Sequence, residues 1–212
     1  MIKGILFDLD GTVLNSIEDI KISLNYVLKK HGYTELKTEF VKSVLGFGAY
    51  ELIRRLPIMD KDFEVIFSEY KDRYQINLTN KSKAYDGILP MLRRLKEKGI
   101  KISLVSNKEI GKVRLISRVL FDNIFDFIIG TSNIYKPKPD TGMLNKTLQE
   151  LHLEPSDCIY VGDTEVDYET AKNSKLVSIG VTWGFRPKEA LEKINFDYLV
   201  DKVEDLEEIL SR

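Results

Sequence analysis

The stretch IKGILFDLDGT, residues 2–12, decides the fold of this chain. A short apolar segment, Ile2 to Leu9, stops at a polar turn that begins with Asp10 and Gly11. Short apolar runs that end in turn residues are typical of buried β-strands. Further apolar segments that end at polar residues or glycine follow at 100–105, 127–130, 158–161 and 176–179. The sequence therefore predicts a sheet assembled from short buried strands.

Helical patterns separate these segments. In 88–98, Leu89, Leu92 and Leu95 share one face, and Gly99 is placed as a C-terminal stop. Similar patterns cover 113–120, 143–151 and 166–173. Strands that alternate with helices of this length predict a parallel sheet covered on both faces. Ligands in such α/β folds bind beyond the carboxyl ends of the strands, so we expect the polar residues there to meet in one crevice.

Residues 15–81 interrupt this alternation. Helical spacing extends from Ile17 up to Gly32, and no segment of this region is predicted to be a strand. Further helical patterns follow at 38–45, 49–56 and 60–76. We therefore expect a helical domain at 15–81, inserted into an α/β core formed by 1–14 and 82–212.

Composition excludes some classes of partner. Lys and Arg number 32 against 33 Asp and Glu, and this balance gives no general attraction for nucleic acid or anionic membranes. No apolar stretch approaches the ~18 residues of a membrane helix, and Asp8 interrupts the N-terminal segment too early for a signal peptide. The single cysteine, Cys158, lies in an apolar segment and is expected to be a buried thiol. We expect a cytoplasmic protein.

Two carboxylates stand at the end of the first predicted strand. Residues two apart in an extended chain share a side, so Asp8 and Asp10 can both approach the crevice. Carboxylates this close both ionise easily only if a cation or proton lies between them. Gly11 allows a tight turn whose N–H groups could point at a phosphate. A solvated acidic turn would give the same local pattern.

A second acidic cluster follows a later strand. Asp163 and Asp167 are four residues apart and share a face if a helix begins between them. Together with the first cluster, they could build an oxygen-rich, octahedral Mg²⁺ site. A helix N-cap with acidic residues in its first turn explains this stretch equally well.

A hydroxyl and a lysine complete the candidate set. Ser106 ends a predicted strand and offers its hydroxyl to a phosphate oxygen. Pro137 and Pro139 stiffen a loop in which a lysine can hold a fixed position. Lys136 and Lys138 both lie beside these prolines, and the local sequence does not choose between them.

Taken in chain order, these residues resemble the haloacid dehalogenase superfamily. The family's Asp-x-Asp-x-Thr, strand-end Ser or Thr, Lys-Pro-x-Pro and Gly-Asp-x-x-x-Asp motifs are matched by Asp8 to Thr12, Ser106-Asn107, Lys136 to Pro139 and Gly162 to Asp167. The third match selects Lys136 over Lys138. The insert looks like the C1 cap of the phosphoglycolate phosphatase-like branch, so the resemblance implies a Rossmann-like core with a helical cap.

The resemblance also implies roles for these residues. Asp8 would form an aspartyl-phosphate, and Asp10 would act as general acid and base. Mg²⁺ would be held by Asp8, the carbonyl of Asp10, Asp163 and, through water, Asp167. The phosphoryl oxygens would be bound by Gly11, Thr12, Ser106, Asn107 and Lys136.

The function expected from this resemblance is Mg²⁺-dependent hydrolysis of a small phosphorylated metabolite by a monomer, with a dimer as the alternative. The branch suggests phosphoglycolate, and an inorganic pyrophosphatase would use the same core. Phosphomutases of the β-phosphoglucomutase kind usually carry a His where this chain has Ile20. A phosphoryl-accepting regulatory domain would not need the long helical insert.

Overall fold

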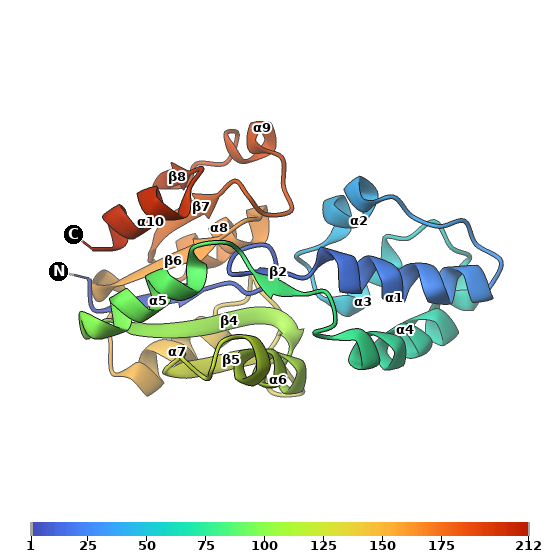
Figure 1. Ribbon diagram of the computed structural model, residues 1–212, viewed down its shortest axis with the longest axis horizontal. Coiled ribbons are helices and arrows are strands. Elements are labelled where there is room, and N and C mark those ends of the chain that lie inside the picture. Colours follow the sequence, from blue (N-terminus) through green and yellow to red (C-terminus); the bar gives the residue numbers. More distant parts are fainter. Residues whose placement is uncertain (1, 212) are drawn as a thin grey trace.

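The computed structural model describes residues 2–211 as a parallel sheet with helices on both faces and a helical cap at one end (Figure 1). The sheet has six strands in the order β5-β4-β1-β6-β7-β8, and every pairing in it is parallel. The strands are β1 (Gly4–Phe7), β4 (Lys101–Glu109), β5 (Phe127–Thr131), β6 (Cys158–Gly162), β7 (Val177–Val181) and β8 (Tyr198–Val200). Because β1 lies between β4 and β6, the residues that follow these three strands meet at one place.

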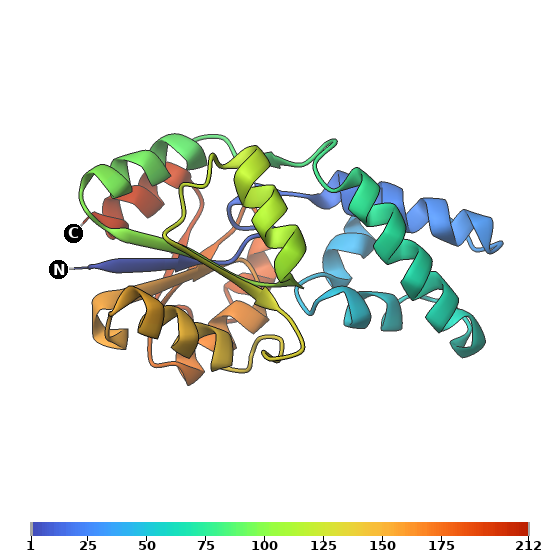
Figure 2. The ribbon, with the colours of Figure 1, turned by 90° about the horizontal axis from the view of Figure 1, so that it is seen from below.

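The first strand is apolar at every position because both faces of the sheet are covered. Ile5 and Phe7 pack into the larger hydrophobic core, whereas Leu6 between them packs into the smaller one on the other face. Helices α5, α6 and α10 lie on one face, and α7 and α8 lie on the other (Figure 2). The helices of the core are α5 (Ile88–Glu97), α6 (Ile110–Leu120), α7 (Gly142–Leu151), α8 (Glu165–Asn173), α9 (Lys188–Leu191) and α10 (Val203–Leu210).

The cap lies beyond the carboxyl ends of the core strands (Figure 1). It is built from α1 (Ile17–Lys30), α2 (Thr38–Val44), α3 (Ala49–Arg54) and α4 (Phe63–Asn77), with a 3₁₀ turn at Asp60–Asp62. A two-stranded antiparallel ribbon, β2 (Leu14–Asn15) with β3 (Lys83–Ala84), joins it to the core. Asp19 of α1 accepts hydrogen bonds from the backbone N–H groups of Lys81 and Ser82 at 2.9 Å and 2.7 Å, which fixes the return connection beside the first.

The predicted α/β fold is confirmed, including the parallel sheet and its flanking helices. The sequence did not predict β8 or the short ribbon between cap and core. The helices from α1 to α4 all fall within 15–81, and on that basis we propose the division into a cap at 15–81 and a core at 1–14 and 82–212. Within residues 2–211 we find no helix of sufficient length and apolar character to span a bilayer.

Candidate active site

Three aspartates converge where β1 and β6 end. Asp8 directly follows β1, Asp163 directly follows β6, and Asp167 lies in the first turn of α8. One carboxylate oxygen from each lies within 4.8 Å of the other two. All three side chains are buried, so the acidic residues that the sequence places at separate strand ends form one cluster.

Asp163 is held in place by its neighbours. The backbone N–H of Phe185 donates to its Oδ2 at 2.7 Å, and the hydroxyl of Thr12 donates to its Oδ1 at 3.4 Å. Gly11, at φ +91°, and Gly184 both approach this carboxylate so closely that an added Cβ would lie 2.2 Å and 2.3 Å from Oδ2. These two turns therefore need glycine because the carboxylate occupies the space of a side chain.

Asp167 serves both the helix and the cluster. Its Oδ2 accepts hydrogen bonds from the backbone N–H and the hydroxyl of Thr164 at 3.1 Å and 2.7 Å, which caps the start of α8. Its Oδ1 instead accepts from the Lys138 ammonium at 2.7 Å. The carboxylate thereby fixes a lysine in the site as well as the helix terminus.

Lys138 is the lysine of this cluster. Its Nζ donates to Asp8 Oδ1 at 2.6 Å and to the hydroxyl oxygen of Tyr160 at 2.9 Å, and the residue is only 4% exposed. Asn107 holds its backbone, because Lys138 N donates to Asn107 Oδ1 at 2.6 Å and Asn107 Nδ2 donates to Lys138 O at 3.1 Å.

The structure places Lys138, and not the expected Lys136, in this cluster. Lys136 is exposed and lies outside the cluster, although it matches the position of the motif lysine. The physical reason is that two hydrogen bonds from Asn107 hold the backbone of Lys138, whose side chain bonds to Asp8. We therefore propose that Lys138 takes the role expected of Lys136.

The other residues expected to bind phosphate divide into two groups. Ser106 is buried and lines the pocket beside Asp8. Gly11 instead donates its N–H to Leu14 O at 2.9 Å, and Thr12 donates its hydroxyl to Asp163. Asn107 Nδ2 donates to Gly46 O of the cap at 2.9 Å as well as to Lys138 O, which uses both of its amide hydrogens. These hydrogen bonds connect all three residues to their neighbours, and of the three only Asn107 lines the pocket.

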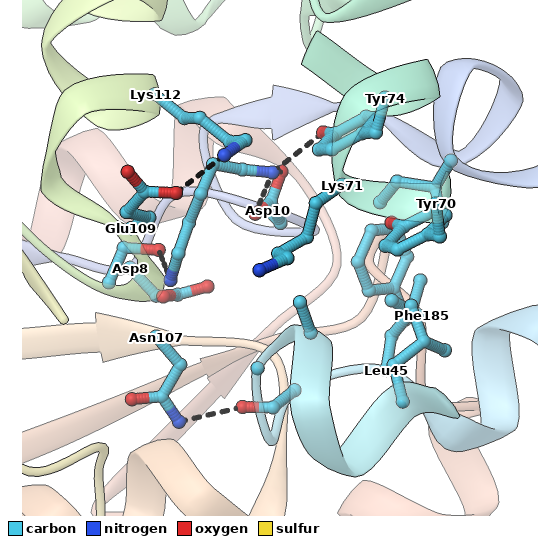
Figure 3. A pocket seen from close by; sticks show the side chains of 17 residues that line it. Asp8, Asp10, Leu45, Tyr70, Lys71, Tyr74, Asn107, Glu109, Lys112 and Phe185 are labelled. Carbon is cyan, nitrogen blue, oxygen red and sulfur yellow. Dashed lines mark hydrogen bonds and ion pairs between the residues drawn. The ribbon is translucent and has the colours of Figure 1, made fainter. Parts of the chain in front are cut away.

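Asp10 lies on the cap side of Asp8 and is bonded from both domains (Figure 3). The Ser16 hydroxyl donates to its Oδ1 at 2.5 Å, and Lys108 Nζ lies 2.7 Å from its Oδ2. Lys108 Nζ also donates to the hydroxyl oxygen of Tyr74, on α4, at 2.7 Å. A general acid or base must keep a fixed orientation, and these contacts fix that of Asp10.

Arg186 makes a second connection between cap and core. Its guanidinium forms a bidentate pair with Glu165 at 2.7 Å and 2.9 Å. It also donates to Lys42 O at 2.9 Å and Leu45 O at 2.8 Å, which are carbonyls at the end of α2. Leu45 O lies just beyond the last residue of α2, where a helix carbonyl has no partner in a following turn, so the core arginine supplies a hydrogen bond to the end of a cap helix.

The electrostatics of the cluster fit a bound cation. Burial, with the neighbouring charges of Asp167 and Asp10, raises the pKa of Asp8 from 3.8 to about 7 although Lys138 opposes the shift. Burial and the charges of Asp167 and Asp8 raise the pKa of Asp163 well above its usual range. The cluster thus has three buried carboxylates, and the Lys138 ammonium pairs with two of them, those of Asp8 and Asp167. An oxygen-rich group with an excess of negative charge can hold a divalent cation.

We expect the metal-free protein to lose stability as the pH rises from about 4 to about 7. Asp8 keeps its proton in the folded protein up to about pH 7, whereas the unfolded chain releases it near its ordinary pKa of 3.8. Because the unfolded state then binds fewer protons, the free energy of unfolding falls with pH, by on the order of 4 kcal/mol over the full shift. Unfolding by urea in EDTA across this pH range measures the loss.

Two comparisons isolate the contribution of Asp8. Asp8→Asn removes the titrating carboxyl, so its stability should fall less with pH than that of the wild type. Added Mg²⁺ should restore wild-type stability near neutral pH, because a cation that binds only the folded protein stabilises it. The same pH dependence in wild type and Asp8→Asn, both in EDTA, would contradict the expectation.

Comparison with known proteins agrees with this geometry. A family model described as haloacid dehalogenase-like hydrolase matches residues 5–181, which include the whole aspartate cluster and Lys138. The chain belongs to the haloacid dehalogenase-like hydrolase family. The expected family is therefore confirmed.

Individual members of the family extend the comparison. Phosphoglycolate phosphatase from Aquifex aeolicus is 33% identical over 185 residues, which cover 86% of each chain. Pyrophosphatase PpaX from Bacillus mycoides is 26% identical over 213 residues, which cover 100% of this chain and 98% of the relative. A crystal structure from Lactobacillus delbrueckii, of a protein with a proposed assignment as a phosphoglycolate phosphatase, superposes with a TM-score of 0.94 at 28% identity over 98% of both chains. The chain is a phosphatase-type hydrolase of the phosphoglycolate phosphatase-like branch.

Sequence reasoning gave no individual role to Lys108, Tyr74 or Arg186. Each has a hydrogen-bond partner in the other domain, and no local spacing connects it to the site. A lysine directly after the motif pair Ser106-Asn107 is the one sequence signal that could have indicated Lys108.

Proposed function

We propose that the protein is a Mg²⁺-dependent phosphatase that transfers the phosphoryl group of a small phosphorylated metabolite to Asp8 and then hydrolyses the aspartyl-phosphate. The observation that carries this proposal is the placement of Asp8. Its carboxylate lines the pocket between core and cap and is held by Lys138 at 2.6 Å beside two further buried aspartates. A carboxylate fixed in this way is suited to nucleophilic attack on phosphorus.

In the first step, a carboxylate oxygen of Asp8 attacks phosphorus and the bond to the leaving oxygen breaks. Lys138 and the Ser106 hydroxyl stabilise the negative charge on the phosphoryl oxygens. Asp10 donates a proton to the leaving oxygen. In the second step, Asp10 takes a proton from the water that attacks phosphorus, and Asp8 is released. Lys108 and Ser16 keep the Asp10 carboxylate oriented for both transfers.

The same aspartates would hold the metal. Asp8, Asp163, Asp167 and the main-chain carbonyl of Asp10 supply the oxygen ligands that Mg²⁺ prefers. When bound, the ion offsets the repulsion between the carboxylates and the phosphoryl group. The three buried carboxylates support this assignment, because Lys138 is the one lysine within residues 2–211 that forms ion pairs with them, and it pairs with Asp8 and Asp167.

The pocket weighs against a phosphomutase. Ile20 lines it and is 2% exposed, and an isoleucine cannot supply the acid–base function expected of a His at this position in a mutase. A regulatory domain that only accepts a phosphoryl group has no need of a cap that closes over its acceptor. Among hydrolases, the relatives support phosphoglycolate or pyrophosphate as substrate.

Hydrolysis of p-nitrophenyl phosphate and of a panel of phosphorylated metabolites tests the proposal. We expect Mg²⁺-dependent release of phosphate that EDTA abolishes and that added Mg²⁺ restores, with the highest kcat/KM for a small substrate. Release of phosphate that is unaffected by EDTA, or none from any substrate, would contradict the proposal. A monomer in the cytoplasm remains the prediction for the working form, and the buried thiol of Cys158 is compatible with a reducing compartment.

A further inference from the structure

The pocket between cap and core is small. Its volume is about 100 Å³, well below the ~300–1,000 Å³ of sites that enclose drug-sized ligands. Asp8, Asp10 and Ser106 form its core side, whereas Leu52, Tyr70 and other residues of the cap close the opposite side. The leaving group of a substrate that binds at Asp8 within this pocket must therefore be compact.

The acidic side chains that line the pocket all have lysine partners. Asp8 pairs with Lys138 at 2.6 Å, and Asp10 pairs with Lys108 at 2.7 Å. The third acid, Glu109, pairs with Lys112 at 2.5 Å. Each acidic side chain that lines the pocket is therefore already paired with a lysine before any ligand enters.

Among the cations that line the pocket, one has no acidic partner within residues 2–211. Lys71, on the cap helix α4, lines the pocket but forms no ion pair with any residue between 2 and 211. Figure 3 shows its side chain extending from α4 into the pocket. Its Nζ lies 4.6 Å from the centroid of the Phe67 ring, a cation–π contact that steadies the ammonium without neutralising it. Lys108 and Lys112, in contrast, already face carboxylates.

We propose that Lys71 binds a negatively charged group on the leaving part of the substrate. This inference rests on the phosphatase function proposed above and deepens it. The preferred substrates are compact phosphate esters or anhydrides whose leaving group carries a carboxylate or a second phosphoryl group. Core residues would then hold the phosphoryl group that is transferred, and the cap lysine would distinguish an anionic leaving group from a neutral one.

A matched pair of substrates tests the role of Lys71. 2-Phosphoglycolate and 2-hydroxyethyl phosphate are similar in size, and only the first carries a charge on its leaving group. We expect Lys71→Gln to lower kcat/KM for phosphoglycolate or pyrophosphate roughly 10- to 100-fold, because a hydrogen bond to a charged group is lost. The value for hydroxyethyl phosphate should change by less than about twofold. A larger loss for phosphoglycolate would identify a carboxylate as the partner of Lys71, and a larger loss for pyrophosphate would identify a phosphoryl group.

Further variants separate charge from structure. Lys71→Arg keeps the charge and should retain most of the preference for anionic substrates, whereas Lys71→Glu should lose more than Lys71→Gln. Lys61→Gln removes an exposed cap lysine outside the pocket and should leave every substrate unaffected. Equal losses on charged and neutral substrates in Lys71→Gln, or no loss on either charged one, would overturn the proposal. A wild type that hydrolyses no substrate would instead refute the phosphatase function, and this inference with it.

Discussion

Asp8→Asn is expected to abolish turnover. The amide has nearly the shape of the carboxylate but cannot attack phosphorus, so we expect kcat to fall on the order of 10⁴- to 10⁶-fold, as when other enzymes lose their nucleophile. The fold should persist, because a neutral side chain relieves the unfavourable burial that raises the pKa of Asp8 to about 7. Steady-state hydrolysis with saturating Mg²⁺ measures the loss, and thermal unfolding shows that the variant is folded.

Asp86→Asn is the matched control for this experiment. Asp86 is an exposed aspartate of the core and is not among the residues that line the pocket, so its amide should leave kcat within about twofold of the wild type. Mass spectrometry should verify that the new amide at position 8 has not reverted to the acid. Turnover of Asp8→Asn close to that of the wild type would remove Asp8 from the chemistry.

Lys138→Gln is expected to lower both kcat/KM and stability, whereas Lys136→Gln is expected to leave kcat/KM nearly unchanged. Loss of the Lys138 ammonium removes a charge that stabilises the phosphoryl oxygens, and we expect kcat/KM to fall about 10²- to 10³-fold. The same substitution leaves Asp8 and Asp167 buried without their cation, so stability in EDTA should fall by about 3–5 kcal/mol. Lys136 is exposed, and its replacement should change kcat/KM by less than about twofold.

Separate measurements keep the two effects of Lys138→Gln apart. Kinetics with saturating Mg²⁺, under conditions in which urea unfolding shows the variant to be folded, report the catalytic loss alone. A large loss in Lys136→Gln together with near-normal activity of Lys138→Gln would contradict our assignment and favour the lysine that the motif selects.

Much of the fold follows from local pattern. The strand before Asp8 is apolar at each position because the sheet is covered on both faces, and that regularity is visible in the sequence. Strand β8 was not predicted because it has only three residues, lies at the edge of the sheet and has an exposed residue, Tyr198. An edge strand needs no continuous apolar run, so its pattern resembles that of a loop.

The acidic part of the site was predictable for a related reason. Asp8 and Asp163 each stand at the end of an apolar strand, and topology brings the ends of neighbouring parallel strands together. The choice of lysine was not predictable from spacing. Lys136 and Lys138 share one proline-rich loop, and the distinction comes from Asn107, 31 positions before Lys138.

The contacts between cap and core were the least predictable part. Lys108 donates a hydrogen bond to Tyr74, which is 34 positions away in the sequence. Arg186 donates one to the carbonyl of Lys42, which is 144 positions away. Neither residue has a local pattern that specifies its partner, because the relative placement of the two domains brings them together. The same holds for Lys71, whose position in the pocket depends on how α4 packs over the carboxyl ends of the core strands.

The most direct test of the central claim is chemical trapping of the phosphorylated residue. The enzyme is mixed with Mg²⁺ and substrate, quenched during turnover and reduced with borohydride, which converts an aspartyl-phosphate to homoserine. Peptide mass spectrometry should find homoserine in place of aspartate at position 8, only when substrate is present and not in Asp8→Asn. Substrate-dependent reduction at another aspartate, or none during active turnover, would contradict the role of Asp8 as the nucleophile.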